Sequence, residues 1–207
     1  MLRIVSDGIN YACGLTLLGL TLSYFLNPWL GTPLYLLALF CLWFFRDPNR
    51  KIPPGDVLVS PADGKIVAVR NGPGEIRVSI FLNVFNVHVN RSPAAGRITA
   101  IRYEKGKFRV ASLDEASAEN EKNTITLDAG GTTVVFSQIA GLIARRIVCY
   151  KQVGDIVTAG ERIGLIKFGS RVDVFFGPEW APEVTTGQRV SAGSSVLARR
   201  IENGAAS

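Results

Sequence analysis

Histidine, cysteine and methionine are all scarce in this chain of 207 residues, which holds one histidine, three cysteines and one methionine. A single histidine excludes the multi-histidine sites of most zinc enzymes, and we expect no metal site. Cys13 and Cys41 lie in apolar sequence, Cys149 stands apart from both, and no C-x-x-C pair occurs. We therefore expect three reduced, apolar thiols rather than a disulfide framework.

Charge is nearly absent from the first 45 residues, where Arg3 and Asp7 are the only charged side chains. Gly8–Leu26 is uncharged over 19 residues, and a helix of that length reaches about 28 Å, close to the hydrocarbon thickness of a bilayer. A turn at Asn27–Pro33 and a second, shorter apolar run at Leu34–Phe45 follow. This pattern predicts an N-terminal α-helical membrane hairpin, either spanning or re-entrant.

The cations around this hairpin predict its orientation. They flank it at Arg3 and Arg46–Lys51, and its turn has none, so both ends should face the cytoplasm. A cleaved signal peptide would have one apolar run, whereas this chain has two. A lipoprotein is also a poor match, because its cysteine motif should follow the apolar run and Asn10–Cys13 precedes it. We expect residues 1–51 to anchor the protein at the cell membrane, with residues 52–207 as a globular domain on the cytoplasmic side.

The whole net charge of +6 lies beyond residue 45. A basic domain behind an apolar segment indicates an anionic membrane surface as the partner rather than nucleic acid. The sequence leaves homo-oligomerisation open.

The globular part alternates short β-branched runs with Gly, Pro, Asn and Asp, which predicts a mainly β domain. We expect an exposed loop over 104–123, with a short helical turn at 116–122. The expected strands are Asp56–Ser60, Lys65–Val69, Ile76–Leu82, Val84–Asn90, Gly96–Tyr103, Thr124–Leu127, Thr132–Ile139, Arg146–Gln152 and Arg171–Phe176.

An internal repeat of the form G-x-x-V-x-A-G-x-x-[IV] occurs at Gly154–Ile163 and again, 33 residues later, at Gly187–Val196. Asp56–Gly64 is a looser copy. Turn glycines and a buried valine in each copy are typical of hammerhead-like β units in barrel-sandwich folds. Two copies are equally consistent with turns in one β barrel, and they do not make a solenoid.

The single histidine, His88, lies in a run whose alternation places Asn86, His88 and Asn90 on one face. It is the one side chain here whose ordinary pKa suits general-base chemistry near neutrality, although lone histidines are more often structural. Asp63 precedes a glycine, as turn aspartates commonly do. From residues alone, a nucleophile–base–orienter set around His88 is one reading among several.

Two Gly-Ser pairs, Gly169–Ser170 and Gly193–Ser194, interrupt β-like runs, and the plain reading of each is a turn or bulge. Arg145 and Arg146 are candidates for binding phosphate, although strand arginines are more often surface charges. The residues themselves therefore indicate a membrane-anchored β domain with one His-centred candidate site.

Five ordered motifs across nearly the whole chain resemble the phosphatidylserine decarboxylase family in its short form. The motifs are Phe44–Pro48, Pro61–Gly64, Phe85–His88, Gln138–Gly141 with Ala144–Ile147, and Ile163–Ser170. The resemblance implies self-cleavage at Gly169–Ser170, which gives a β chain of residues 1–169 and an α chain of residues 170–207 that stay together. Ser170 would become a covalent pyruvoyl group, the only cofactor, and the substrate would be an anionic serine phospholipid.

The resemblance also implies residue roles. His88, oriented by Asp63, would deprotonate the Ser170 hydroxyl, which attacks the Gly169 carbonyl. The pyruvoyl carbonyl would then condense with the substrate amine and accept the electron pair released with CO₂. Long-form members carry two histidines three residues apart shortly before a proline; counting back from Pro93 places Arg91 where the second would be.

Two other functions compete with this one. The repeats would fit a non-enzymatic, lipoyl-like barrel-sandwich adaptor, but the chain lacks a lysine in an Asp-Lys-Ala or Met-Lys-Met context. A basic peripheral protein that simply binds anionic lipid or nucleic acid would fit the charge. Only the decarboxylase should appear as two pieces on a denaturing gel.

Overall fold

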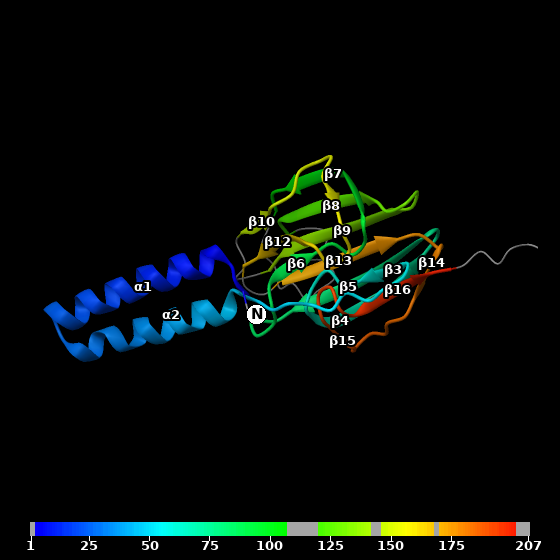
Figure 1. The fold of residues 1–207 in the computed structure, drawn as a ribbon. Coiled ribbons are helices and arrows are strands. Elements are labelled where there is room, and N and C mark those ends of the chain that lie inside the picture. The colour runs from blue at the N-terminus through cyan, green and yellow to red at the C-terminus, as the bar shows by residue number, and fades with distance from the viewer. Residues whose placement is uncertain (1–2, 107–119, 142–145, 168–169, 202–207) are drawn as a thin grey trace, which may run out of the picture. The chain divides into compact units, whose positions relative to one another are not determined.

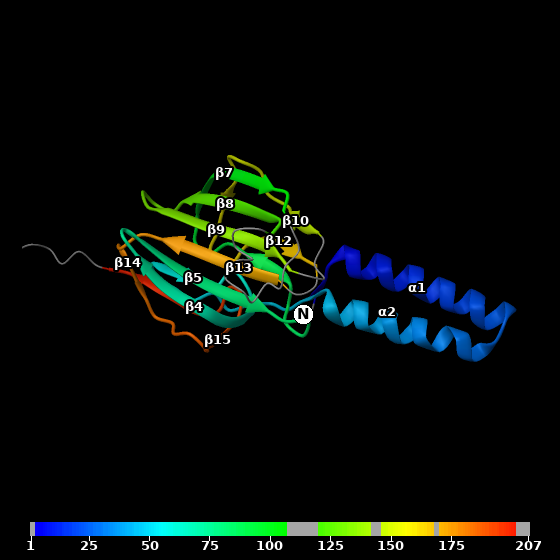
Figure 2. The same ribbon diagram turned by 180° about the vertical axis from the view of Figure 1, so that it is seen from behind.

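The computed structural model describes residues 3–106, 120–141, 146–167 and 170–201. It divides into two compact units, Met1–Asn49 and Arg50–Ser207. The first unit is helical and the second is built from strands (Figures 1 and 2). The prediction of a mainly β protein is therefore confirmed.

The helical unit is an antiparallel hairpin whose two long helices touch through small residues. Gly8 lies against the Phe45 side chain and Gly19 against the Tyr35 ring, so an added Cβ at either glycine would collide with an aromatic side chain. Ser23 and Tyr35 share a hydrogen bond of 3.3 Å between their hydroxyls. The elements are β1 (Arg3–Ile4), α1 (Ser6–Phe25), the 3₁₀ turn η1 (Pro28–Gly31), α2 (Thr32–Phe44) and β2 (Arg46–Asp47), with β1 paired to β2.

Within the described residues, neither helix is both long and apolar enough to pass through a bilayer. Helix α2 has 13 residues, about 20 Å at 1.5 Å per residue. Helix α1 has 20 residues, but polar side chains such as Asn10, Thr21 and Ser23 dilute its apolar character. The predicted helical hairpin is present, and the structure does not support a membrane-spanning form of it.

The β unit consists of one curled eight-stranded sheet and two three-stranded sheets, all antiparallel. The large sheet has the order β11-β7-β8-β9-β13-β5-β4-β15, and the small sheets are β10-β12-β6 and β14-β16-β3. The strands are β3 (Val57–Val59), β4 (Gly64–Gly72), β5 (Glu75–Leu82), β6 (Val89–Arg91), β7 (Gly96–Glu104), β8 (Lys122–Asp128), β9 (Thr133–Ala140), β10 (Ile147–Cys149), β11 (Ile156–Val157), β12 (Arg162–Ile166), β13 (Ser170–Phe176), β14 (Trp180–Pro182), β15 (Arg189–Val190) and β16 (Val196–Arg200).

The β unit contains two halves with matching hydrogen bonds. We define half A as Asp56–Ile66 with Gly187–Val196, and half B as His88–Ile98 with Gly154–Ile163. The N–H of Ile66 donates to Gln188 and the N–H of Gly187 returns to Ile66; in half B, Ile98 makes the same exchange with Asp155 and Gly154. The predicted repeat is therefore one part of a longer structural duplication.

The halves meet at the second glycine of each repeat. Gly160 has φ +73° and Gly193 has φ +72°, in the left-handed region that favours glycine. A Cβ added at Gly193 would lie 3.4 Å from the Gly160 Cα and 3.1 Å from the Arg91 Cδ. These two positions are thus fixed as glycine by both backbone angle and close approach.

The core fills the concave face of the large sheet. Alternate residues of the central strands, such as Ile80, Phe136 and Val172, are fully buried there. Trp180 of β14 and Leu197 of β16 join the same cluster, so the small sheet β14-β16-β3 packs onto the large one.

The strand predicted over Val84–Asn90 differs from this fold. Val84–Asn90 is not one strand, because β6 begins at Val89 and a turn precedes it. Asn83 and Asn86 stabilise that turn through side-chain bonds to the N–H groups of Phe85 and Asn83, local bonds that compete with strand pairing. The expected loop at 104–123 and its helical turn lie largely outside the described residues.

Candidate active site

Four strand ends meet at one edge of the large sheet, and the predicted residues Asp63 and Ser170 lie at two of them. Antiparallel pairing puts the start of β4, the end of β5, the start of β13 and the end of β9 at that edge. Ser170, the first residue of β13, pairs with Leu82 on one side and Ala140 on the other. Asp63 directly precedes β4, and His88 lies six residues beyond Leu82.

Ser170 is completely buried, and its Oγ has no hydrogen-bond partner among the described residues. A buried hydroxyl left without a partner costs about 1–3 kcal/mol, so such a group calls for a functional explanation. Its backbone is fixed by neighbours on both sides. Gly169, the other half of the predicted cleavage site, lies outside the described residues.

The chain after Ser170 is anchored by a buried ion pair. Arg171 and Asp173 are fully buried, with 2.7 Å between Arg171 Nε and Asp173 Oδ1. Arg171 Nη2 also donates to Ser79 Oγ at 2.8 Å. These contacts tie β13 to β5 and fix the register in which Ser170 begins the strand.

His88 is 2% exposed and is held beside the segment that leads to Ser170. Its carbonyl accepts from the N–H of Ile166 at 3.3 Å, four residues before Ser170. Its Nδ1 lies 3.0 Å from the Asn86 carbonyl oxygen, which can only accept. In the neutral ring Nδ1 therefore carries the proton, and the buried Nε2 has the lone pair that a general base needs.

Asp63 is held by partners other than His88. Its two oxygens accept from Arg50 Nη2 at 2.8 and 2.9 Å, and Oδ1 also accepts from the N–H of Ala192 at 2.8 Å. No hydrogen bond among the described residues joins Asp63 to His88. The carbonyl of Asn86 orients the ring instead, and the predicted orienting role of Asp63 stays a prediction.

A chain of buried amides also reaches this edge. Asn123 Nδ2 donates to Gln138 Oε1 at 3.0 Å, and Gln138 Nε2 donates to Asn90 Oδ1 at 2.9 Å. Asn90 Nδ2 is then a buried donor without a partner in the described part of the chain. Gln138 is a diagonal neighbour of Ser170 across the β9–β13 pair, so the free amide lies on the same face as the Ser170 hydroxyl.

The sequence predicts Asn90 on the face of His88 and includes Gln138 in a family motif. It gives no sign of the contacts of Arg50 and Ala192, or of the role of the Asn86 carbonyl. Arg50 was expected to be a juxtamembrane charge, and it belongs to the β unit. Arg91 donates to the Gly160 carbonyl at 2.8 Å, a contact between repeat segments. Arg145 lies outside the described residues.

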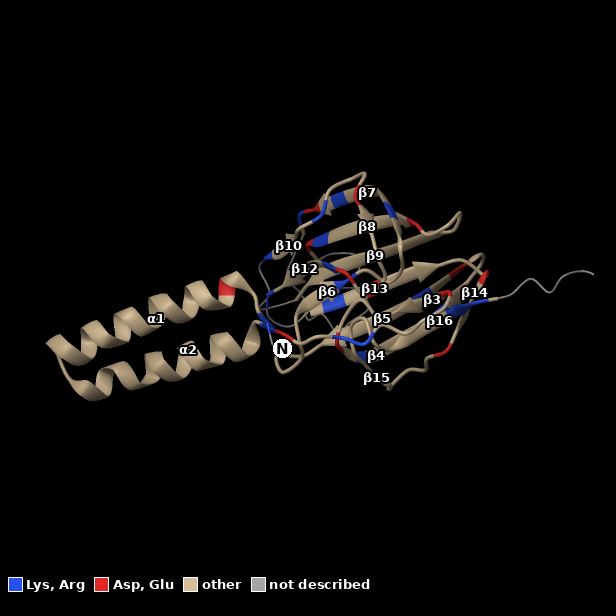
Figure 3. Ribbon diagram, in the orientation of Figure 1, with Lys and Arg blue, Asp and Glu red and all other residues tan. Residues whose placement is uncertain are grey.

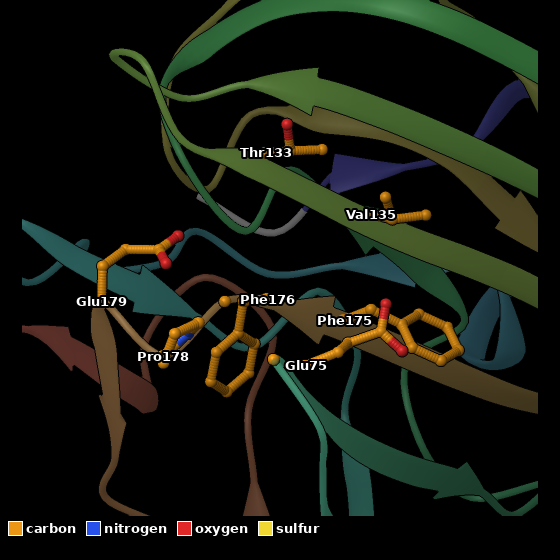
Figure 4. A pocket seen from close by; sticks show the side chains of 9 residues that line it. Glu75, Thr133, Val135, Phe175, Phe176, Pro178 and Glu179 are labelled. Atoms are coloured by element: carbon orange, nitrogen blue, oxygen red, sulfur yellow. The ribbon is translucent and has the colours of Figure 1, made fainter.

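A cavity of about 310 Å³ (Figure 4) lies at the end of the sheet opposite to Ser170. It borders Phe176, which ends β13, six residues and about 20 Å from Ser170. Glu75 and Glu179 line it, and its described lining contains no lysine or arginine. An acidic cavity at that distance does not suit the anionic substrate that the motif resemblance implies.

Comparison with known proteins identifies the family. The family model for phosphatidylserine decarboxylase matches residues 37–198. A phosphatidylserine decarboxylase proenzyme of Solibacter usitatus is 59% identical over 201 residues, which cover 97% of this chain and 98% of that protein. The chain belongs to the phosphatidylserine decarboxylase family.

Other members of the phosphatidylserine decarboxylase family match at similar length. The proenzymes of Polynucleobacter asymbioticus and Cupriavidus pinatubonensis are 45% and 44% identical, over 95% and 96% of this chain and 94% and 96% of theirs. The resemblance stated from the motifs is thereby confirmed, and the chain is a decarboxylase. The lipoyl-like adaptor finds no support.

Proposed function

We propose that the protein cuts its own chain before Ser170 and then decarboxylates phosphatidylserine by means of a pyruvoyl group formed from that residue. Membership of a family whose curated relatives are named proenzymes supports both steps. The observation that carries the proposal is the Ser170 hydroxyl, buried and without a described partner at the first residue of a central strand.

The cleavage step uses groups of this chain and one water. His88 Nε2 takes the hydroxyl proton, Ser170 Oγ bonds to the carbonyl carbon of residue 169, and the peptide C–N bond breaks to give an ester and an amine. Removal of the Ser170 α-proton then expels the residue-169 carboxylate, and water converts the resulting dehydroalanine to pyruvoyl with release of ammonia. General-base help of this kind contributes about 10²–10⁴-fold.

The residues around Ser170 fit the pyruvoyl group that this step would leave. The group supplies an electrophilic carbonyl that takes up the electrons released with CO₂. Leu82 and Ala140 hold the backbone of residue 170 from both sides, and the Arg171–Asp173 pair keeps the new terminus in the sheet. His88 would return a proton to the product.

We place the protein at a membrane surface, with the helical unit as the attachment. Both helices expose large apolar side chains, and a shallow apolar groove of about 420 Å³ runs along α1. Only one acidic residue interrupts the helices (Figure 3). An apolar surface of this extent on a charge-poor hairpin is suited to lie in the headgroup region.

Cleavage is tested by intact mass spectrometry of the purified chain. We expect one fragment that ends at Gly169 and a second, with a blocked first residue, that covers 170–207. Ser170→Ala should stay full length. A cut at Gly193–Ser194, or an uncleaved chain that releases CO₂ from phosphatidylserine, would refute the assignment.

Attachment is tested by vesicle flotation. Leu36 and Leu39 are each 63% exposed on α2, so Leu36→Asp with Leu39→Asp should reduce flotation with vesicles while leaving self-cleavage unchanged. Equal flotation of both proteins would argue against attachment through the hairpin.

A further inference from the structure

A small cavity of about 170 Å³ opens at the same end of the sheet as Ser170, and its lining suits an anion. It has two cations and two side-chain amides, and no carboxylate among the lining residues that the structure describes. Those residues are Gly64, Lys65, Phe81, Asn83, Asn86 and Arg189.

The two cations face each other across neighbouring strands. Lys65 of β4 is the direct partner of Arg189 of β15, which brings their Cβ atoms to about 4.5–5.5 Å, and like charges in such a pair destabilise a sheet. Both side chains are exposed, and neither has an acidic partner among the described residues. A bound anion would turn this repulsion into attraction.

The two amides are oriented to donate. The Oδ1 of Asn83 accepts from the Phe85 N–H, and the Oδ1 of Asn86 accepts from the Asn83 N–H, both at 2.9 Å. The amide oxygens are therefore occupied by the turn, and each Nδ2 remains as a donor. Two cations and two N–H₂ groups match the oxygen atoms of a phosphodiester.

The position of the cavity relates it to Ser170. Lys65 pairs with Phe81, and Phe81 pairs with Arg171, so the Lys65 side chain lies on the face of the sheet opposite to the Ser170 side chain, one residue from the strand end where Ser170 lies. Two strand spacings, about 10 Å, separate Lys65 from that strand. The turn that supplies Asn83 and Asn86 leads directly to His88. Val84 and Phe85 are exposed at its tip, where they could contact the acyl chains of a lipid whose headgroup is bound in the cavity.

We infer that this cavity binds the phosphodiester of the serine phospholipid while the headgroup reaches around the end of β13 toward residue 170. The inference rests on the proposed function and adds the residues that select a phosphorylated headgroup. Lys65 and Arg189 supply charge, and the Asn83 and Asn86 amides supply direction.

Half B provides a natural control. The counterpart of the Lys65–Arg189 pair is Arg97 with Ile156. Arg97 donates to the Gly154 carbonyl at 3.1 Å, and Ile156 is 72% exposed. Half B therefore has one cation where half A has two, so Arg97→Gln removes a similar charge from the matching place.

The test measures CO₂ release by the mature full chain with two substrates. One is dihexanoyl phosphatidylserine in neutral detergent micelles, and the other is O-hexyl serine, which has the amine and carboxylate but no phosphate. Lys65→Gln with Arg189→Gln should raise KM for the phospholipid about ten-fold or more, since two charge-assisted hydrogen bonds are lost. The double variant's kcat, its KM for O-hexyl serine and its rate of self-cleavage should stay within about two-fold of wild type. For the control Arg97→Gln, the kcat, both KM values and the rate of self-cleavage should all stay within that range.

Three outcomes would overturn the inference: an unchanged KM for the phospholipid, an equal rise in KM for O-hexyl serine, or an equal effect of Arg97→Gln. A fourth concerns the source of the phosphate. If the double variant loses only its binding to phosphatidylglycerol vesicles and keeps its KM in neutral micelles, the cavity binds bulk lipid and the substrate assignment is wrong. A wild-type chain that never cleaves would instead refute the proposed function.

Discussion

The two halves of the β unit differ mainly where chemistry is proposed. Asp56–Ile66 and His88–Ile98 are identical at six of eleven positions, and the carbonyl groups of the shared Ser, Pro and Ala residues accept matching hydrogen bonds in both halves. The proposed functional residues stand at positions that differ. The differing pairs are Asp56/His88, Leu58/Asn90, Val59/Arg91, Asp63/Ala95 and Lys65/Arg97.

This comparison separates residues that build the fold from residues that use it. Ser60 and Ser92 each donate to the carbonyl two residues on, at 2.7 Å. Gly64 and Gly96 each leave no room for a Cβ beside a carbonyl of the next strand. A duplicated scaffold thus needs these residues twice, while the site needs His88 and Asp63 once.

The largest effect is expected at His88. His88→Ala removes the proposed base, so self-cleavage should slow by about 10²–10⁴-fold, followed on denaturing gels after synthesis. The chain has no second histidine to replace it. Asp56→Asn, at the matching position of half A, should cleave like wild type. Normal cleavage by His88→Ala would assign the base to another group.

The next effect concerns Asp63, which half B replaces with Ala95. Asp63→Ala leaves Arg50 without its carboxylate partner in a site where both side chains are only 12–13% exposed. We expect a loss of about 2–3 kcal/mol in the free energy of unfolding, measured with urea on the Ser170→Ala background so that no cleavage intervenes. Adding Arg50→Met should recover part of that loss, because the charge without a partner is then gone; a further loss would contradict this account.

Gly160 and Gly193 test whether the halves are equal as scaffold. Each has a positive φ and lies close to the other, so Gly160→Ala and Gly193→Ala should each lower the free energy of unfolding by about 1 kcal/mol or more. Similar losses would support two equivalent repeats. A loss confined to one glycine would show that only one half depends on this contact.

The smallest effect is a pH dependence in half B alone. The hydrogen bond from Lys151, followed by that from the Thr158 N–H, lowers the pKa of Glu161 below its usual 4.5. A lowered folded pKa contributes stability above pH 4.5 that disappears as the pH falls through the folded value. Because Glu161 is about one-third exposed, Glu161→Gln should lose only about 0.5 kcal/mol at pH 7.

Thermal melts at several pH values would measure this difference. The Glu161→Gln and wild-type curves should converge as the pH falls below 4.5 through the lowered pKa of Glu161. Ser194→Ala, at the matching position of half A, should show the same difference from wild type at every pH. Failure of the first two curves to converge would mean that the loss at Glu161 does not come from its charge.

Much of the fold follows from local sequence, and the exceptions have local causes. β-branched runs such as Ile76–Leu82 and Arg171–Phe176 coincide with strands. The sequence predicts a strand before His88 because polar and apolar residues alternate there. The segment forms a turn instead, because the Asn83 and Asn86 side chains bond to nearby backbone N–H groups. The two-residue strands β11 and β15 were seen only as part of the repeat, since they are too short to show a period.

The site was less predictable than the fold. Motifs indicated Asp63, His88 and Ser170, but their meeting at one edge depends on strand order. Arg50 reaches Asp63 across 13 residues, and Gln138 reaches Asn90 across 48. The Lys65–Arg189 pair joins residues of distant strands, and only the register of the sheet reveals it.

The central place of β13 has a consequence for the life of the protein after cleavage. A cut before Ser170 creates a chain end in the middle of an eight-stranded sheet, between β9 and β5. The small fragment then supplies β13, β14, β15 and β16. Strands β13, β15 and β16 pair with strands of the large fragment, and β14 pairs with β16. Separation of the two pieces would require global unfolding, so an isotope-labelled small chain should not exchange into folded protein. Every molecule should keep the partner from which it was cut.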